Sequence, residues 1–249
     1  MAVIMLGGSP PGSEPTSIQS ANLQLWFDAA FGVYETDAKT DPCEDADGVV
    51  RWYDRKADTF YVVRNSVGAT PTYHATGVNG RPMIRFDATD DGMYSAGTSG
   101  YQGTSNTGFL VWKPPASATI QRGILFYDGA NANWGIYNGT AARIDNYNFD
   151  GSQDTVTKSA TLDAWMIVTC MNNGTNLYIG VNDTRTASMS SVASGNHVDG
   201  DTLYIRSVPA AYVQTDIAEY IHYDIALAES DRQEIERRLA WKYGITIGY

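Results

Sequence analysis

The stretch from residue 216 to residue 243 constrains the fold most, because its pattern changes from that of a strand to that of a helix. Residues 217–223 are rich in aromatic and β-branched side chains that alternate between two faces, which favours a strand. Beyond them an apolar residue recurs every four positions, at Ile235, Leu239 and Tyr243. This spacing predicts one amphipathic helix, which Gly244 ends.

The ends of this predicted helix carry polar residues that suit a helix. Asp231 lies in the first turn and Lys242 in the last, which complements the helix dipole. Ser230 and Gln233 have the spacing of a capping box. We expect the helix to start at about Glu229.

The preceding residues have the pattern of short strands separated by turns. The clearest hairpin joins residues 165–171 to residues 176–181 through Asn173-Gly174, a pair that readily adopts the positive φ angles of a tight turn. A second tight turn is expected at Asn79-Gly80. The sequence predicts an all-β fold, a two-sheet antiparallel β-sandwich with one short C-terminal α-helix.

Six segments carry a resemblance to a known family: residues 25–29, 50–54, 80–91, 216–219, 226–227 and 231–245. They resemble laminin-G-like domains of bacterial and phage proteins, in the concanavalin A-like lectin and glucanase superfamily. Ala228 departs from the family pattern, which usually has Ser there, so the helix cap must come from Ser230 or be weaker. The resemblance implies a jelly-roll sandwich over residues 21–249, a fold that hosts lectins, hydrolases, adhesins and virion proteins.

Composition excludes several kinds of partner. The 249 residues include 28 acids and 17 bases, a formal net charge of −11, which argues against binding to nucleic acid or to an anionic membrane. Residues 3–6 form too short an apolar run for a signal peptide, and no stretch is long enough to span a bilayer. We expect one domain and no signal peptide.

Residues 1–20 are predicted to form an extended arm, because Gly, Ser and Pro dominate them after a short apolar head. The residues expected to bind a partner are Val3, Ile4, Met5, Leu6, Pro10 and Pro11. The partner is another subunit or another protein of the same assembly. The alternative is an arm folded back on its own sandwich.

An acidic segment between residues 31 and 48 offers a candidate cation site. Asp45, Asp47 and Asp54 match part of a calcium-loop pattern, although Cys43 stands where a carboxylate should begin it. Calcium is the one cofactor that the sequence indicates. The alternative is a solvated acidic loop.

Aromatic and amide side chains suggest a candidate glycan site at Trp134, Tyr137, Asn138 and Tyr147. Aromatic faces stack on sugar rings, and amides donate hydrogen bonds to hydroxyl groups. The alternative is that most of the 16 Tyr and 6 Trp pack in the core of the sandwich.

No catalytic motif is apparent. The Glu-x-Asp-x-x-Glu run of glucanases on this fold is absent, and Glu219 with Asp224 has the wrong spacing. His74, His197 and His222 are isolated from one another and lack metal-site spacing. The sequence thus predicts a protein that is not an enzyme.

Two functional hypotheses follow from the resemblance. The first is a bacteriophage virion structural protein, a capsid decoration or tail-associated component that is assembled in the host cytoplasm and attached through residues 1–20. Its partners would be other virion proteins and itself as a homo-oligomer, for which a trimer would suit. The second is a lectin or adhesin that recognises surface glycans. A glycan hydrolase or lyase ranks third.

Overall fold

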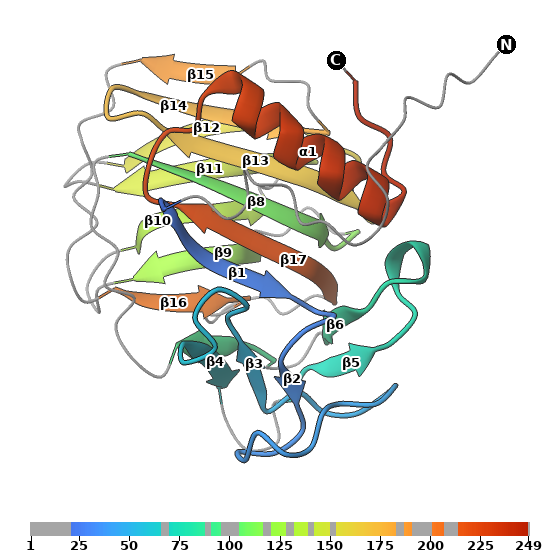
Figure 1. The fold of residues 1–249 in the computed structure, drawn as a ribbon. Helices are drawn as coiled ribbons and strands as arrows, with labels where there is room; N and C mark the ends of the chain where they lie inside the picture. The colour runs from blue at the N-terminus through green and yellow to red at the C-terminus, as the bar shows by residue number, and fades with distance from the viewer. Residues whose placement is uncertain are drawn as a thin grey trace, which may run out of the picture.

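The structure, a computed structural model, describes residues 21–65, 70–87, 91–95, 105–116, 121–127, 132–138, 142–149, 153–182, 187–190, 201–206 and 214–248. These residues form two antiparallel β-sheets that lie face to face, with one α-helix against the outer face of one sheet (Figure 1). The predicted all-β sandwich with a C-terminal helix is confirmed.

The sheet that carries the helix is called sheet A. Its strands are β1 (Leu23–Asp28), β5 (Thr72–His74), β6 (Met83–Phe86), β8 (Asn106–Lys113), β13 (Met166–Asn172), β14 (Asn176–Val181), β15 (Ala187–Ser190) and β17 (Thr215–Tyr223). They are ordered β15-β14-β13-β8-β17-β6-β5, and β1 also pairs with β17. The central strand β17 is buried along its whole length, because the core lies on one side of it and the helix on the other.

The second sheet is called sheet B. Its strands are β2 (Val33–Tyr34), β3 (Arg51–Tyr53), β4 (Tyr61–Arg64), β7 (Met93–Ser95), β9 (Gln121–Tyr127), β10 (Ala132–Asn138), β11 (Arg143–Phe149), β12 (Gln153–Ser159) and β16 (Thr202–Ile205). They are ordered β12-β11-β10-β9-β16-β7-β4-β3-β2. Strands distant in the sequence, such as β16 and β7, therefore lie side by side.

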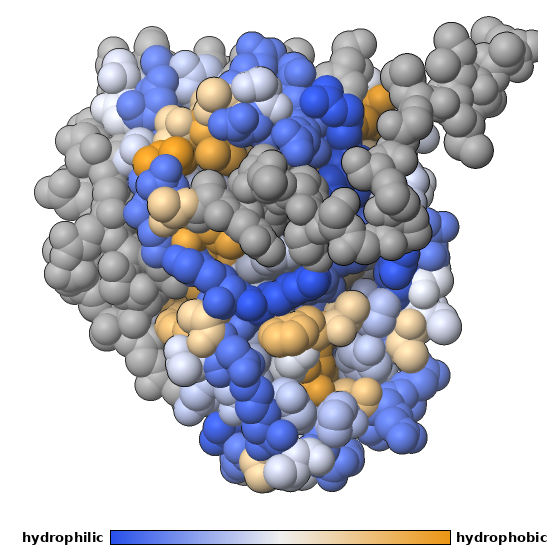
Figure 2. Space-filling view, in the orientation of Figure 1, coloured by the Kyte–Doolittle hydropathy of each residue, from blue (hydrophilic) through white to orange (hydrophobic). Residues whose placement is uncertain are grey.

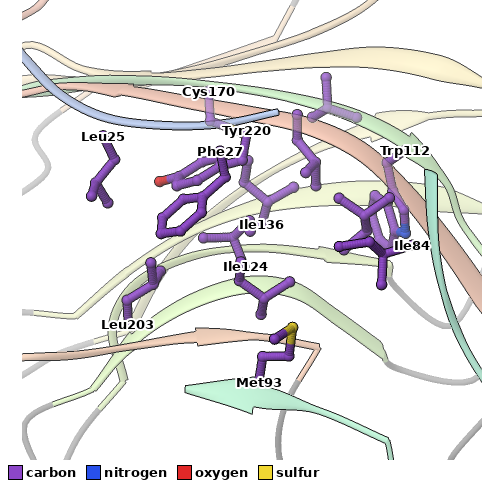
Figure 3. Close-up of a cluster of buried hydrophobic side chains, with 14 of the residues drawn as sticks. Leu25, Phe27, Ile84, Met93, Trp112, Ile124, Ile136, Cys170, Leu203 and Tyr220 are labelled. Carbon is purple, nitrogen blue, oxygen red and sulfur yellow. The ribbon is translucent and has the colours of Figure 1, made fainter. Parts of the chain in front are cut away.

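The main core fills the space between the sheets, where alternate residues of strands such as β1, β8 and β10 point inward. In Figure 3, Phe27, Trp112 and Tyr220 of sheet A face Ile124 and Ile136 of sheet B. Cys170 lies among these side chains and is fully buried, as expected of an apolar residue in a strand.

Helix α1 (Glu229–Tyr243) packs its apolar stripe on the outer face of sheet A. Ile235, Leu239 and Tyr243 are buried there in a second cluster with Phe109 and Ile221. The predicted helix and its contact stripe are confirmed. Gly244, with φ of 63°, ends the helix in the left-handed conformation that glycine adopts at low cost.

The predicted capping box is wrong. The helix begins at Glu229, so Ser230 lies inside the first turn, and the N-cap residue is Ala228, which has no side-chain acceptor. Gln233 instead donates its side-chain amide to Glu229 at 3.1 Å.

The two predicted turns lie where the sequence placed them. Asn173 Oδ1 accepts the backbone N–H groups of Thr175 and Asn176, and Gly174 has φ of 83°, so the pair closes the β13–β14 hairpin. Asn79 and Gly80 end a short 3-10 helix (Val78–Gly80) between β5 and β6.

Candidate functional site

The outer face of sheet B carries one tyrosine on each of eight consecutive strands, from β11 to β2. Each alternates with residues that face the main core; Tyr94, for example, lies between the buried Met93 and Ser95, and Tyr204 between the buried Leu203 and Ile205. We call this surface the tyrosine face; it comprises Tyr34, Tyr53, Tyr61, Tyr94, Tyr127, Tyr137, Tyr147 and Tyr204.

The rings of the tyrosine face contact one another in three groups. The centroid distances are 5.5 Å for Tyr34 and Tyr53, 5.0 Å for Tyr53 and Tyr61, 6.2 Å for Tyr94 and Tyr204, 6.1 Å for Tyr127 and Tyr204, and 5.2 Å for Tyr137 and Tyr147. Six of the eight side chains are partly exposed, whereas Tyr53 and Tyr137 are 6% and 8% exposed. The groups hold each ring in place while leaving aromatic surface open to solvent.

Strand register aligns this surface into one straight row across the sheet. The residues paired in turn from β11 to β2 are Tyr147, Gly135, Leu125, Tyr204, Tyr94, Val63, Arg51 and Tyr34. We call these eight residues the register row. It runs perpendicular to the strands, and the other four tyrosines flank it.

Gly135 lets an aromatic ring lie flat in this row. A Cβ at this position would be 2.9 Å from Cε1 of Tyr137 and 2.7 Å from the carbonyl oxygen of Ile124. Because Gly135 has no side chain, the Tyr137 ring covers its backbone and contacts Tyr147 on the next strand.

Two cations lie over rings at the β2–β3–β4 end, and each is paired with a carboxylate. The Arg51 guanidinium carbon is 4.6 Å from the centroid of the Tyr61 ring, and its Nε donates to Asp37 at 3.3 Å. The Lys39 ammonium is 4.4 Å from the centroid of the Tyr53 ring and pairs with Asp58. Both cations are therefore neutralised locally while they brace the rings.

The phenol group of Tyr204, at the centre of the face, stays protonated over a wide pH range. Burial raises the pKa of Tyr204, and the neighbouring Tyr127 and Tyr94 raise it further. Neutral phenol groups both donate and accept hydrogen bonds, as hydroxyl-rich ligands require.

The structure divides the four predicted glycan-binding residues between the two faces of sheet B. Tyr137 and Tyr147 lie on the tyrosine face. Trp134 and Asn138 are fully buried on the inner face, so the prediction of glycan contacts is wrong for them. The reason is the two-residue period of a strand, which directs Trp134 and Tyr137 to opposite sides.

The predicted calcium site is also wrong. Asp54 is fully buried and accepts the backbone N–H groups of Trp26, Lys56 and Ala57, so it closes a local turn. Asp45 accepts the N–H of Ala75, and Asp47 accepts that of Glu44. Within the described residues no group of three or more His, Cys, Asp or Glu side chains is placed to hold a metal ion.

A buried ion network, which the sequence did not reveal, ties α1 to β1 and β17. Glu219 is fully buried and accepts hydrogen bonds from Trp26 Nε1 at 2.7 Å, Tyr243 Oη at 2.8 Å and Lys242 Nζ at 2.7 Å. Lys242 also donates to Asp28 at 2.8 Å. Asp28 on β1 is the residue paired with Glu219 on β17.

Asp28 stays ionised in this network. Burial alone would raise the pKa of the Asp28 carboxyl, but Lys242 and Arg55 outweigh burial and hold that pKa below its ordinary value. Since Asp28 and Glu219 are buried and bound to cations, the pair fastens the helix to the sheet and is closed to a substrate.

On the side of the molecule that carries α1, hydrophilic residues cover most of the described surface in view, and hydrophobic ones form small separate patches (Figure 2). Phe31 and Trp241, 37% and 62% exposed, are the large exposed apolar side chains of the described part. The predicted partner-binding residues of the arm, at positions 3–6, 10 and 11, lie outside the described residues. In the part of the chain that the structure describes, no helix has the length and apolarity to cross a membrane.

No protein-family model and no curated protein matches the sequence. Solved structures do match the fold. The binding domain of botulinum neurotoxin serotype D matches with a TM-score of 0.61 and 11% identity, over 87% of this chain and 52% of that one. The binding domain of Paraclostridial Mosquitocidal Protein 1 matches with a TM-score of 0.61 and 11% identity, over 88% of this chain and 52% of that one.

A third match is the serotype D ligand-binding domain in complex with N-acetylneuraminic acid, with a TM-score of 0.58 and 10% identity over 87% of this chain. The chain spans about half the length of the structures it matches. At these identities the likeness shows a shared fold.

Proposed function

We propose that this chain is a non-enzymatic, lectin-like domain that binds glycans on the tyrosine face. The observation that carries the proposal is the tyrosine face, which has one tyrosine on each of eight consecutive strands and in which six of the eight side chains are partly exposed. Aromatic rings stack on the C–H faces of sugars, and phenol groups exchange hydrogen bonds with sugar hydroxyls. The matched structures support the proposal because they are binding domains, and one is in complex with N-acetylneuraminic acid.

A glycan array tests this function, with binding compared between the native chain and Tyr94→Ala. Tyr178→Ala is the matched control, because Tyr178 is a partly exposed tyrosine on β14 in sheet A. We expect binding that Tyr94→Ala weakens and Tyr178→Ala leaves unchanged. Array signals at background level for the native chain would rule out the proposed function.

The laminin-G-like affiliation and the virion role stay hypotheses that rest on the sequence resemblance. Under them, the domain is a capsid or tail component attached through residues 1–20. Deleting residues 2–18 should then leave the melting temperature almost unchanged and abolish incorporation into the particle. Mass spectrometry of purified virions that repeatedly lacked the full-length chain would refute the virion role.

A further inference from the structure

The register row is long compared with a single sugar ring. Seven inter-strand spacings separate β11 from β2, and at about 4.8 Å each they extend about 34 Å along the sheet. Tyrosines stand at both ends of the row, at Tyr147 and Tyr34, and at its centre, at Tyr94 and Tyr204. One sugar ring can cover only one of these groups, so the whole row matches a ligand of several rings.

Three cations at the tyrosine face are each paired with a carboxylate. Arg51 pairs with Asp37, Lys39 with Asp58, and Arg143 with Asp145 at 3.0 Å. An acidic sugar would have to displace a carboxylate from one of these cations. It would also approach a chain whose formal net charge is −11.

We infer that the ligand of the tyrosine face is a linear, uncharged polysaccharide that lies along the register row, perpendicular to the strands. This inference rests on the proposed glycan-binding function and specifies its ligand. Successive sugar rings stack on the tyrosines at the two ends and in the centre. Gly135 has no side chain to stand above the sheet, so the Tyr137 ring lies over its backbone. Because each stack contributes modestly, affinity should rise with chain length until the row is covered.

The experiment is calorimetric titration with two ligand panels. The neutral panel contains linear glucans, mannan, xylan and galactan, with each binder also tested as fragments from one to eight sugars. The acidic panel contains polygalacturonate, alginate and polysialic acid. We expect at least one neutral polymer to bind, with affinity that rises from the disaccharide to the longest fragments, and the acidic polymers to bind at least tenfold more weakly.

Substitutions at the row's ends test the placement of the ligand. Tyr34→Ala and Tyr147→Ala should each weaken binding of the longest fragments by about tenfold, the effect of losing one well-packed aromatic contact. Tyr178→Ala, on the other sheet, should change nothing. Circular dichroism confirms that each variant is folded, and Tyr34→Phe, which keeps the ring, should retain most of the affinity.

Asp37→Asn tests whether the pairing of Arg51 with Asp37 excludes acidic polymers. The Asp37 side chain is 78% exposed, so removing its charge should leave the fold intact. Freeing Arg51 from its carboxylate should raise the affinity for acidic polymers and leave that for neutral ones unchanged. If Asp37→Asn still bound acidic polymers no better than the native chain, this role of the Arg51–Asp37 pair would be contradicted.

The remaining outcomes separate this inference from the proposed function. The native chain could bind a monosaccharide with full affinity, or prefer acidic glycans, and lose that binding in Tyr94→Ala. Either result would overturn the inference of a linear neutral ligand. The proposed binding of glycans by the tyrosine face would still stand. A neutral polymer whose binding is unchanged in all of the tyrosine-face variants would overturn the placement. No binding to either panel, together with a blank glycan array, would overturn both.

Discussion

Replacing Glu219 by Ala should lower the free energy of unfolding by about 3–5 kcal/mol, the usual cost of removing one partner from a buried ion pair. Glu219 is fully buried and is the acceptor shared by Trp26 of β1 and by Lys242 and Tyr243 of α1. Without it, two buried neutral donors lose their acceptor, at about 1–3 kcal/mol each, and Lys242 loses one of its two carboxylates. The cost of the lost hydrogen bonds is already part of the cost of breaking the ion pair. The two are therefore not added, and about 3–5 kcal/mol is the expected loss.

Urea unfolding followed by tryptophan fluorescence measures this loss. For a domain of this size, the change corresponds to a fall of about 6–20 °C in melting temperature. Asp58→Asn is the matched control, because its ion pair with Lys39 is largely exposed and contributes at most about 1 kcal/mol. The reasoning fails if Glu219→Ala costs no more than Asp58→Asn.

Three further predictions address pH, the tyrosine face and a turn. Because the pKa of Asp28 lies below its ordinary value, its contribution to stability is complete above about pH 4 and disappears as the pH falls through the lower, folded-state pKa. Acid unfolding should therefore be less steep in Asp28→Asn, and an unchanged slope would contradict the network. Gly135→Val should displace the Tyr137 ring and weaken glycan binding, whereas Gly180→Ala, whose Cβ would be 3.7 Å from its nearest neighbour, should leave binding unchanged; equal affinities would refute a role for Gly135. Gly174→Ala should cost about 1–2 kcal/mol in thermal unfolding, because φ at this turn is 83°, and a cost near zero would show that the hairpin tolerates a side chain.

Local patterns were enough to predict the helix and many of the strands. Alternation in residues 217–223 corresponds to β17, the Asn173-Gly174 turn closes the β13–β14 hairpin, and the four-residue spacing of Ile235 and Leu239 corresponds to α1. These features depend on neighbours in the sequence. The helix cap was mispredicted because the N-cap residue, Ala228, lies two residues before Ser230, the N-cap of the capping-box pattern.

The candidate site depends on strand order, which local patterns do not contain. Tyr94 and Tyr204 are distant in the sequence and become neighbours only because β7 pairs with β16. A signal was nonetheless present, since each tyrosine of the face occupies the position that alternates with core residues, where a polar residue is usual. Following that alternation through residues 134–138 would also have shown that Trp134 and Asn138 point into the core while Tyr137 points out.

The most direct test of a glycan ligand on the tyrosine face is a crystal structure of the domain with a neutral linear oligosaccharide of six or more sugars. We expect density for successive rings along the register row, stacked on Tyr147, Tyr204, Tyr94 and Tyr34 and running across the strands of sheet B. An oligosaccharide bound instead on the α1 side of the molecule, or lying parallel to the strands, would contradict it.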